Sequence, residues 1–328
     1  MVSSTVDELR RKLKAAEREV ALEIDGRKLH LTNLDKVFWP QPGLRKADLI
    51  DYYIGVSRYL LPHLRNRPLV MVRYPDGIEG EHWFHKDAPE HTPEWVRTKG
   101  IEQESHGQAR ALRYIVCDDL ATLVWLAQLA AIEIHTWSVR RLRSATADDP
   151  DRADRAVFDI DPQTDAFADA VEGARAVCDL LDELDLAYYL KTTGKRGIHV
   201  FAPLTPEREH REVREFVRDA VREIDRREPG LLALSYSKAK RKGRCFIDYA
   251  QNAFGKTNVA PYSLRATTRA TVSTPFRREH LGRVAPGDYR LDNMLRRLAQ
   301  TGDLWQGLPS PAKISVAQAH ARLRSLAR

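Results

Sequence analysis

Two acids, Asp159 and Asp161, end a short apolar run that begins at Arg155 and stops at Pro162. In a strand, residues i and i+2 project from the same face, so the two carboxylates would lie side by side while Ile160 points into the core. Carboxylates held this close repel each other, and a divalent metal ion with oxygen ligands removes the conflict. The spacing therefore indicates a metal site. The alternative is a strand end whose second acid caps the next helix.

A third acid, Asp248, ends a second apolar run that begins at Arg244. If the two runs are strands of one sheet, three carboxylates meet. Such a set can hold two metal ions about 4 Å apart, an arrangement that serves phosphoryl transfer. The first pair alone is weak support for this chemistry, because Asp149 and Asp151 have the same spacing in a segment with the composition of a loop.

The segment from Lys191 to His199 reads Lys-Thr-Thr-Gly-Lys-Arg-Gly-Ile-His and lies between two apolar runs. Its hydroxyls, glycines and cations would let backbone amides and side chains approach a phosphate closely. The spacing of a P-loop is absent. A basic hairpin turn is the alternative for the segment, and a packed core residue is the alternative for His199.

The composition indicates a globular protein with an anionic partner. Its 328 residues are 43% hydrophobic and 30% charged, with a formal net charge of +7, which makes nucleic acid a candidate ligand. The three cysteines form no Cys-x-x-Cys pair, which argues against a zinc site or a disulfide framework and fits a reducing cytoplasm.

The polar N-terminus lacks the apolar block of a signal peptide. The apolar segment 120–134 is too short and too interrupted to span a membrane, so we expect a core helix there.

The C-terminal part of the chain predicts a βαββαβ order. The expected elements are a strand at 155–161, a helix at about 165–184, strands at 187–191 and 197–203, a helix at 206–228 and a strand at 244–249. This is the order of ferredoxin-like and RNA-recognition-type domains, in which helices cover one face of the sheet. The other face of the sheet stays available for ligands.

A charged linker at 140–155 separates this part from an N-terminal part of mixed helices and strands. In the N-terminal part we expect a charged helix at 6–20, a hairpin at 21–31, a helix at about 46–61, strands at 69–74, 81–86 and 114–117, and a polar loop at 100–113.

Five segments in order along the chain carry a resemblance: 31–40 (LTNLDKVFWP), 118–127 (DDLATLVWLA), 158–162 (FDIDP), 193–199 (TGKRGIH) and 246–252 (FIDYAQN). Together they resemble the polymerase domain of bacterial ligase D, which belongs to the archaeo-eukaryotic primase superfamily. The resemblance implies an α+β fold with a primase-type catalytic core, as a single primase-polymerase domain over 1–328. In that fold an N-terminal α/β module (about 1–150) packs on a palm like an RNA-recognition motif (about 151–328), whose sheet is antiparallel or mixed.

The resemblance assigns Asp159, Asp161 and Asp248 as catalytic residues that ligate two metal ions. A further set is assigned to the incoming nucleotide: His135, at the end of the expected core helix, Thr193, Lys195, Arg196, His199, Arg241, Gln251 and Arg265. Two of these depart from the family pattern. Thr193 stands where serine is usual, which keeps the hydroxyl, and Arg196 stands where lysine is usual, which keeps the charge but changes the donor geometry.

In the N-terminal part, Lys36 and Lys46 match a pair that grips the 5′-phosphate at the far side of a DNA gap, and Trp83 and Phe84 match an aromatic pair that stacks on DNA. Without the resemblance, two surface lysines and two core aromatics are the simpler interpretations. The stretch from about 102 to 113 matches a loop near the primer terminus.

The implied function is template-dependent polymerisation: a nucleotidyltransferase that fills short gaps or broken ends with a 5′-phosphate in DNA repair, preferring ribonucleotides. Its cofactors would be two Mn²⁺ or Mg²⁺ ions, and its substrates NTPs or dNTPs. The expected partners are gapped or broken double-stranded DNA, an ATP-dependent DNA ligase and Ku, without a membrane, in the nucleoid-associated cytoplasm of a bacterium. Two alternatives remain open, a two-metal nuclease and a non-catalytic module that binds DNA ends.

Overall fold

The computed structural model describes residues 5–105, 108–140, 152–163, 166–206, 210–235, 237–241, 244–308 and 314–326. The chain divides into two compact units. Unit 1 comprises Met1–Thr136, Val259–Val272 and Tyr289–Asp303, and unit 2 comprises Trp137–Asn258, Ser273–Asp288 and Leu304–Arg328. Each unit therefore combines segments that are distant in the sequence. Most of the expected linker, including Asp149 and Asp151, lies outside the described residues.

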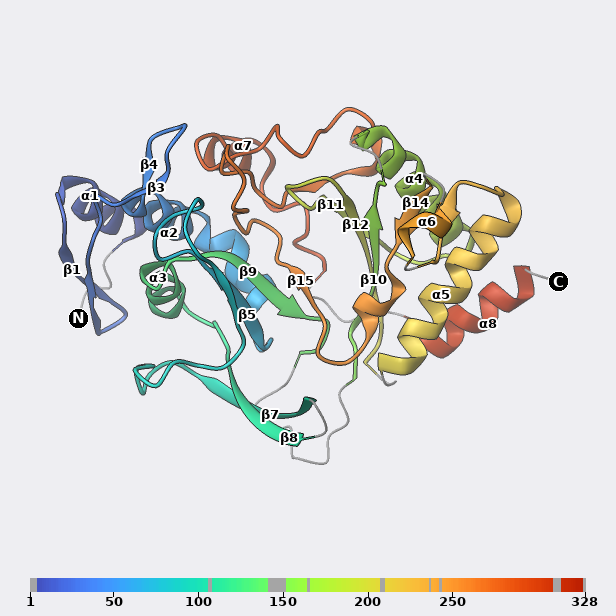
Figure 1. Ribbon diagram of the computed structural model, residues 1–328, viewed down its shortest axis with the longest axis horizontal. Helices are drawn as coiled ribbons and strands as arrows, with labels where there is room; N and C mark the ends of the chain where they lie inside the picture. Colours follow the sequence, from blue (N-terminus) through green and yellow to red (C-terminus); the bar gives the residue numbers. More distant parts are fainter. Residues whose placement is uncertain are drawn as a thin grey trace. The chain divides into compact units, whose positions relative to one another are not determined.

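Unit 1 is built on a sheet with the strand order β15-β9-β5-β6, and on two helices, α2 and α3, that pack together (Figure 1). The long helix α2 buries four side chains at helical spacing: Leu49, Tyr53, Val56 and Leu60. In order along the chain, the elements up to β9 are α1 (Val6–Ala15), β1 (Val20–Ile24), β2 (Arg27–Leu31), β3 (Val37–Trp39), β4 (Leu44–Arg45), α2 (Lys46–Leu64), β5 (Leu69–Arg73), β6 (Trp83–His85), β7 (Thr98–Ser105), β8 (Gln108–Ile115), α3 (Leu120–Gln128) and β9 (Ala131–Trp137). Two later elements, β15 (Thr257–Val259) and α7 (Met294–Thr301), follow in the C-terminal half of the chain.

The expected core helix over 120–134 is wrong in its second half. The helix α3 ends at Gln128, and Ala130 has a positive φ of 63°, which turns the chain into the strand β9. His135 therefore lies in a strand and not at the end of a helix. In β9, Ile132 and Ile134 alternate with the polar Glu133 and His135, which is the period of two of a strand, and the expectation of one continuous helix overlooked this alternation.

The expected loop at 100–113 is also wrong, because the chain forms a hairpin there. The strands β7 and β8 pair without interruption from Thr98 opposite Ile115 to Ser105 opposite Gln108. Backbone hydrogen bonds within a two-stranded ribbon tolerate polar side chains, so polarity alone does not identify a loop. The turn between the strands, His106 and Gly107, lies outside the described residues.

Unit 2 confirms the βαββαβ order. Its sheet has the strand order β13-β14-β10-β12-β11-β16, and the four central strands are antiparallel neighbours. The elements are β10 (Arg155–Asp161), α4 (Phe167–Glu183), β11 (Tyr189–Thr192), β12 (Ile198–Pro203), α5 (His210–Arg227), β13 (Leu232–Ala233), α6 (Lys238–Arg241), β14 (Cys245–Ile247), the 3-10 helix η1 (Tyr249–Asn252), β16 (Pro275–Phe276), the 3-10 helix η2 (Arg278–His280) and α8 (Val316–Leu326).

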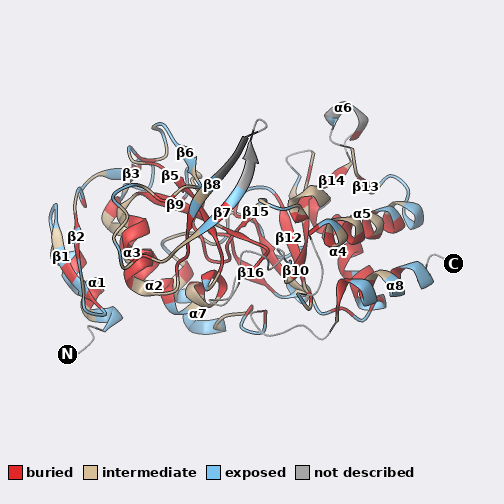
Figure 2. Cartoon of the chain, turned by 90° about the horizontal axis from the view of Figure 1, so that it is seen from below, coloured by how far each residue is buried: buried red, intermediate tan, exposed pale blue. Residues whose placement is uncertain are grey.

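The two faces of this sheet have different surroundings. Along β10, Ala156, Phe158 and Ile160 are buried in a core formed with α4, α5 and α8, which Figure 2 shows with red inner sides and pale outer sides. The alternate residues Asp159 and Asp161 point to the opposite face and are only partly buried. The period of two along the strand therefore separates the core from the acids. No helix among the described residues is long and apolar enough to cross a membrane.

Gly197 brings the turn between β11 and β12 against β10. A Cβ atom at this position would lie 2.4 Å from the carbonyl oxygen of Ile160 and 3.2 Å from Oδ1 of Asp161. Atoms do not approach this closely, so only glycine allows the turn to lie beside the acid pair without a backbone shift.

We predict that Gly197→Ala lowers the free energy of unfolding by about 1–3 kcal/mol, because the added methyl group must displace backbone atoms of β10. Urea unfolding followed by circular dichroism measures the effect. Gly100→Ala is the matched control, since a Cβ there has no neighbour within 4 Å. Equal stability of the two variants would contradict the close contact at Gly197.

Candidate active site

Three strands of unit 2 place functional side chains in one row. Asp159 on β10 lies opposite His199 on β12, and on its other side the amide of Asp248 donates to the carbonyl oxygen of Asp159 at 3.0 Å. Residues that lie opposite each other in a sheet project from the same face, and so does Asp161, two residues along β10. The three acids predicted from the sequence are thus brought together on the face away from the helices.

The electrostatics of Asp161 show how close these charges are. Burial raises its pKa to about 6, and the neighbouring carboxylate of Asp159 acts in the same direction. Arg196 lowers this pKa, Asp248 raises it and Arg241 lowers it, in decreasing order of effect. Two arginines therefore partly offset the mutual repulsion of three carboxylates.

The oxygens of the acids make contacts within the protein. His199 Nε2 lies 2.9 Å from Oδ1 of Asp159. Asp248 caps η1, accepting a hydrogen bond from the amide of Ala250 at 3.0 Å and another from Nε2 of Gln251 at 3.2 Å. Gln251 thus lies beside the third acid, as its assignment to the same site requires.

The donor set suits a hard divalent cation, because carboxylate oxygens are the ligands that Mg²⁺ and Mn²⁺ prefer. Among the described residues, however, no three His, Cys, Asp or Glu side chains are arranged as a closed metal cluster. The hydrogen bonds from Ala250 and Gln251 leave lone pairs on both oxygens of Asp248, so this carboxylate can still accept a metal ion.

The turn from Thr193 to Gly197 is held by the side chain of Thr193. Its hydroxyl oxygen accepts hydrogen bonds from the amides of Lys195 at 3.2 Å and Gly197 at 3.1 Å, and its own amide donates to the carbonyl oxygen of Gly197 at 2.9 Å. Gly194, with φ of 73°, allows the reversal. This hydroxyl is therefore engaged in shaping the turn, a role that serine could also fill.

Two more cations lie in unit 2. Arg241 is nearly buried, donates from Nε to the carbonyl oxygen of Ser235 at 2.7 Å and lies 3.6 Å over the ring of Phe246. Lys191 is fully buried, lies opposite His199 in the sheet and donates to the hydroxyl of Ser273 at 2.7 Å. Sequence analysis gave Lys191 no role; a lysine two residues before the turn in an apolar strand is the signal that could have identified it.

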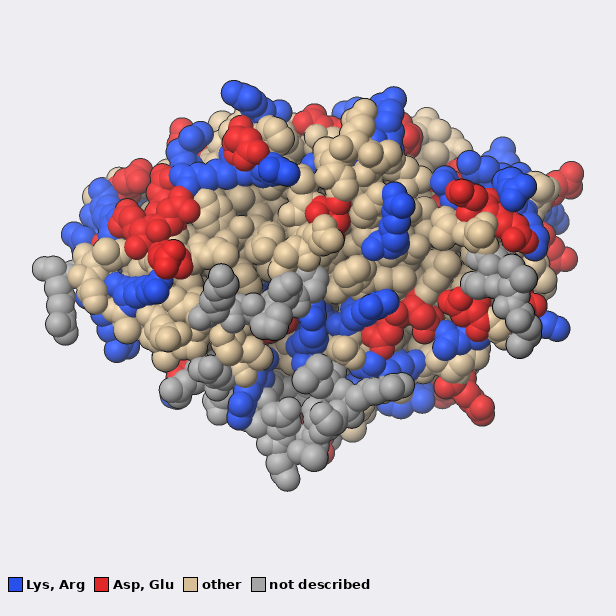
Figure 3. All heavy atoms as spheres, turned by 180° about the vertical axis from the view of Figure 1, so that it is seen from behind, with Lys and Arg blue, Asp and Glu red and all other residues tan. Residues whose placement is uncertain are grey.

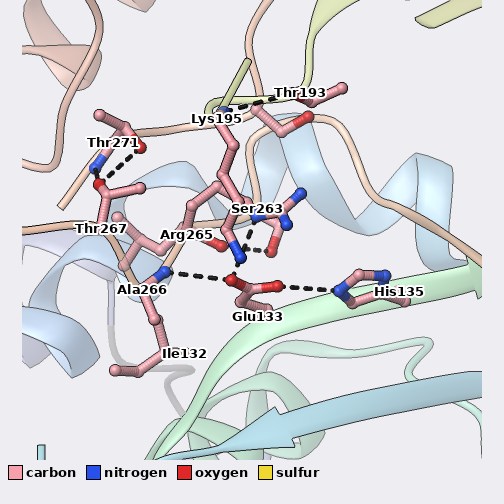
Figure 4. Close-up of polar contacts among 12 residues, drawn as sticks. Ile132, Glu133, His135, Thr193, Lys195, Ser263, Arg265, Ala266, Thr267 and Thr271 are labelled. Atoms are coloured by element: carbon pink, nitrogen blue, oxygen red, sulfur yellow. Dashed lines mark hydrogen bonds and ion pairs between the residues drawn. The ribbon is translucent and has the colours of Figure 1, made fainter. Parts of the chain in front are cut away.

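In unit 1, His135 and Arg265 meet at a buried acid, Glu133 (Figure 4). Glu133 Oε2 lies 3.1 Å from Nε2 of His135, and its Oε1 lies 3.2 Å from Nε of Arg265. Sequence analysis missed Glu133, because Glu-x-His falls on one face of a strand but not of the helix that was expected there.

Lys36 and Lys46 are also brought together. The hairpin of β3 and β4 closes the ten-residue gap between them, and the amide of Lys46 donates to the carbonyl oxygen of Lys36 at 2.9 Å. Lys46 is the first residue of α2, where the helix dipole favours an anion. The side chain of Lys36 forms an ion pair with Asp76.

The cations around Lys46 are close enough to affect its charge. Burial, and to a smaller extent the positive charges of Lys36 and Arg73, lower the pKa of Lys46 from 10.5 to about 8. Arg73 is thus a third cation at this place, which sequence analysis did not identify. Three converging cations, one of them buried, form an arrangement suited to a doubly charged phosphate.

Trp83 and Phe84 lie on the short strand β6 and are 43% and 63% exposed. This exposure excludes the interpretation as core aromatics. The ring of Phe84 meets the ring of His135 edge to face, with centroids 6.1 Å apart. Exposed aromatic rings of this kind can stack on bases.

The net positive charge does not by itself mark a binding face. On the face drawn in Figure 3, blue and red side chains lie among each other and do not form one continuous basic surface. Among the described residues many charges are paired, as in the contact of Arg227 with Glu183 at 2.7 Å. The clusters described above are therefore more informative than the total charge.

The predicted site residues thus fall into two sets. Unit 2 contains the three acids and six of the residues assigned to the nucleotide: Thr193, Lys195, Arg196, His199, Arg241 and Gln251. Unit 1 contains His135, Arg265, Lys36, Lys46, Trp83 and Phe84.

Comparison with known proteins gives a consistent result. Residues 45–305 match a family model described as LigD, primase-polymerase domain. The multifunctional non-homologous end joining DNA repair protein LigD of Mycobacterium tuberculosis is 33% identical over 288 residues, which are 87% of this chain and 37% of the relative. The bifunctional non-homologous end joining protein LigD of Bacillus subtilis is 33% identical over 278 residues, 84% of this chain and 43% of the relative. The chain thus spans less than half the length of these relatives.

A solved structure is also similar: the polymerase domain from Mycobacterium tuberculosis ligase D in complex with DNA. It has a TM-score of 0.80 and 33% sequence identity, and the match covers 87% of this chain and 99% of that chain. The match therefore extends over almost all of a solved polymerase domain.

We predict that Lys46→Met raises the free energy of unfolding at pH 7 by about 1–3 kcal/mol, because the buried ammonium is charged there at a cost. A lysine whose pKa is lowered in the folded state makes folding less favourable, and this cost is fully present below about pH 8. This cost is lost as the pH rises from about 8 to 10.5, where the unfolded state binds more protons.

Urea unfolding at pH 7 and at pH 10.5 tests this prediction, since the advantage of the variant should shrink at the higher pH. Lys36→Met is the control, because the Lys36 side chain is 39% exposed. A Lys46→Met protein that is less stable than the wild type at pH 7 would contradict it.

Proposed function

The chain belongs to the LigD primase-polymerase domain family, a family of DNA-directed nucleotidyltransferases of end-joining repair, and we propose that it fills short gaps or broken ends that carry a 5′-phosphate. The observation that carries this proposal is the meeting, on one face of the unit 2 sheet, of Asp159, Asp161 and Asp248 with the turn from Thr193 to Gly197. Three acids alone would suit a nuclease equally well. A basic turn beside them suits a triphosphate.

In the proposed reaction, the primer 3′-hydroxyl attacks the α-phosphate of the incoming nucleotide. A bond forms between O3′ and the α-phosphorus, the bond from that phosphorus to the bridging oxygen of the β-phosphate breaks, and pyrophosphate leaves. Asp159, Asp161 and Asp248 would hold two divalent cations, Mn²⁺ or Mg²⁺, which supply activation of the hydroxyl and neutralisation of the triphosphate when bound.

The other residues of the proposed site act on charge and orientation. Lys195, Arg196 and His199 lie on or next to the turn and would stabilise negative charge on the phosphates as pyrophosphate departs. Gln251 and Arg241 would support the third acid and the nucleotide. In unit 1, His135 and Arg265 would contact the incoming nucleotide. We further propose a preference for ribonucleotides, which parallel assays with NTPs and dNTPs test.

At the DNA, Lys36 and Lys46 would bind the 5′-phosphate at the far side of the gap, and Trp83 and Phe84 would stack on the bases beside it. Stacking of this kind contributes roughly 1–3 kcal/mol per base. We propose an ATP-dependent DNA ligase and Ku as partners at broken ends in the bacterial nucleoid, since the relatives are named as end-joining proteins.

We predict that the double variant Asp159→Ala, Asp161→Ala lowers nucleotide incorporation on a gapped duplex at least about 1,000-fold, because loss of charge stabilisation worth several kcal/mol has that effect. Primer extension with Mn²⁺ or Mg²⁺ measures it. Asp185→Asn, at a carboxylate that is 93% exposed, is the control and keeps wild-type activity.

Incorporation at the wild-type rate by the double variant would refute the metal assignment. DNA degradation by the wild-type protein without extension would favour the nuclease. Binding of DNA ends without either activity would favour a non-catalytic module.

We predict that Lys36→Ala weakens binding to gaps with a 5′-phosphate about 5- to 20-fold, and binding to gaps with a 5′-hydroxyl much less. Asp76→Asn should strengthen binding to the phosphorylated gap, because it removes the anion that pairs with Lys36. Fluorescence anisotropy at constant salt measures both effects. Equal losses on the two DNAs would reduce the role of Lys36 to general attraction to the DNA backbone.

A further inference from the structure

Glu133 is a buried acid whose neighbours are the side chains of His135 and Arg265. Its side chain is 3% exposed, and it lies on the strand β9 two residues from His135, so both side chains project from the same face. A carboxylate is seldom buried without partners, because removing its charge from water costs several kcal/mol. The contacts of Glu133 therefore show what this charge does.

Both carboxylate oxygens have assigned partners. Oε2 faces Nε2 of His135 at 3.1 Å. Oε1 faces Nε of Arg265 at 3.2 Å and accepts a hydrogen bond from the amide of Ala266, also at 3.2 Å. Figure 4 shows Glu133 between the two cationic side chains, which come from segments 130 residues apart.

A purely structural role does not require the charge of Glu133. Two neutral contacts already attach the segment before Arg265 to β9: the amide of Ala260 donates to the carbonyl oxygen of Ile134 at 2.9 Å, and the amide of Ile134 donates to the hydroxyl of Ser263 at 2.8 Å. Glu133 also accepts from the backbone amide of Ala266, but its contacts with His135 and Arg265 differ from these because they fix the ends of side chains.

The fixed side chains are ones that a nucleotide site needs. A carboxylate only accepts hydrogen bonds, so Nε2 of His135 carries the hydrogen in this contact, and the orientation of the ring is set. On its other side, the ring meets the exposed Phe84 edge to face. Arg265 is also nearly buried, with 8% exposure, so its guanidinium has little freedom of its own.

We propose that Glu133 is a positioning residue for the incoming nucleotide, and that its carboxylate holds His135 and Arg265 in the orientation that binds this nucleotide. The inference rests on the proposed function, in which these two residues contact the nucleotide. Glu133 itself does not touch the substrate. It balances the positive charge of Arg265 and sets where the donors of Arg265 and His135 point.

The critical variants are Glu133→Gln and Glu133→Asp. Glutamine keeps the length but removes the charge and turns one acceptor into a donor, which cannot face Nε2–H of His135 or the guanidinium. Aspartate keeps the charge but is one methylene shorter and cannot reach both partners in the same way. We expect both variants to raise the KM for the nucleotide about 10- to 100-fold on a gapped duplex, with kcat changed less than threefold.

Ser263→Ala is the matched control. It removes one of the neutral contacts between β9 and the same segment, so it should lower the melting temperature without changing the KM for the nucleotide. Binding of a duplex with a 5′-phosphate gap, measured without nucleotide, should be the same for all variants, since Lys36 and Lys46 are intact. If Glu133→Gln lowers stability as Ser263→Ala does but leaves KM unchanged, the positioning role is refuted.

A spectroscopic measurement tests the contact independently of catalysis. In protein labelled with ¹⁵N-histidine, Glu133→Gln should shift the Nε2 signal of His135, which is identified by its loss in His135→Gln. The double variant Glu133→Gln, His135→Gln should raise KM by less than the product of the two single effects. An unchanged Nε2 signal, or fully multiplicative effects on KM, would overturn the proposal.

The assay also separates this inference from the proposed function. Wild-type incorporation together with an unchanged KM in Glu133→Gln and Glu133→Asp refutes the positioning role alone. A wild-type protein that incorporates no nucleotide refutes the proposed function and the positioning role with it.

Discussion

The repulsion among three carboxylates is the constraint on which the chemistry of unit 2 depends. Asp159, Asp161 and Asp248 meet because β14 pairs antiparallel with the end of β10, which places Asp248 beside Asp159. Burial and, second, the neighbouring carboxylate of Asp159 raise the pKa of Asp161 to about 6. Positive charge must therefore be close. Arg196 and Arg241 supply part of it, and divalent cations would supply the rest. The close approach of Gly197 to β10 brings the cationic turn beside the acids, so the packing of the backbone also reduces the repulsion among the carboxylates.

Unit 1 also contains buried charged side chains that lie close to other charged groups. Lys46 is buried beside Lys36 and Arg73, and burial first and these two positive charges second lower its pKa to about 8. A phosphate dianion would neutralise this positive charge. Glu133, in contrast, is balanced within the protein by His135 and Arg265. The first arrangement is suited to receive an anion, and the second to hold cationic side chains in place. Both sacrifice stability for binding geometry, as is common at functional sites.

Sequence patterns predicted the structure correctly where a single hydrophobic period, that of a strand or of a helix, ran through the whole element. The alternation along 155–161 predicted that Asp159 and Asp161 share a face, and the order of strands and helices predicted the sheet of unit 2. The prediction failed at β9, where the alternation of Ile132 and Ile134 with Glu133 and His135 is short and directly follows an apolar helix, and at the hairpin of β7 and β8, where polar residues suggested a loop. The first of these errors affected the interpretation of the site, because a helix does not place His135 and Glu133 on the same face, whereas the strand does.

The sequence by itself determined the family, through five ordered motifs, and determined which residue types can perform the chemistry. Tertiary structure alone decided which of these residues meet. Asp248 lies 89 positions from Asp159 yet is its direct neighbour, because strand register and not sequence distance sets contact. Lys36 and Lys46 meet through a hairpin, and Arg73, Lys191 and Glu133 gain their importance only from neighbours supplied by other strands. The pKa of a group and the direction of its donors depend on burial and on nearby charges, which no local pattern contains.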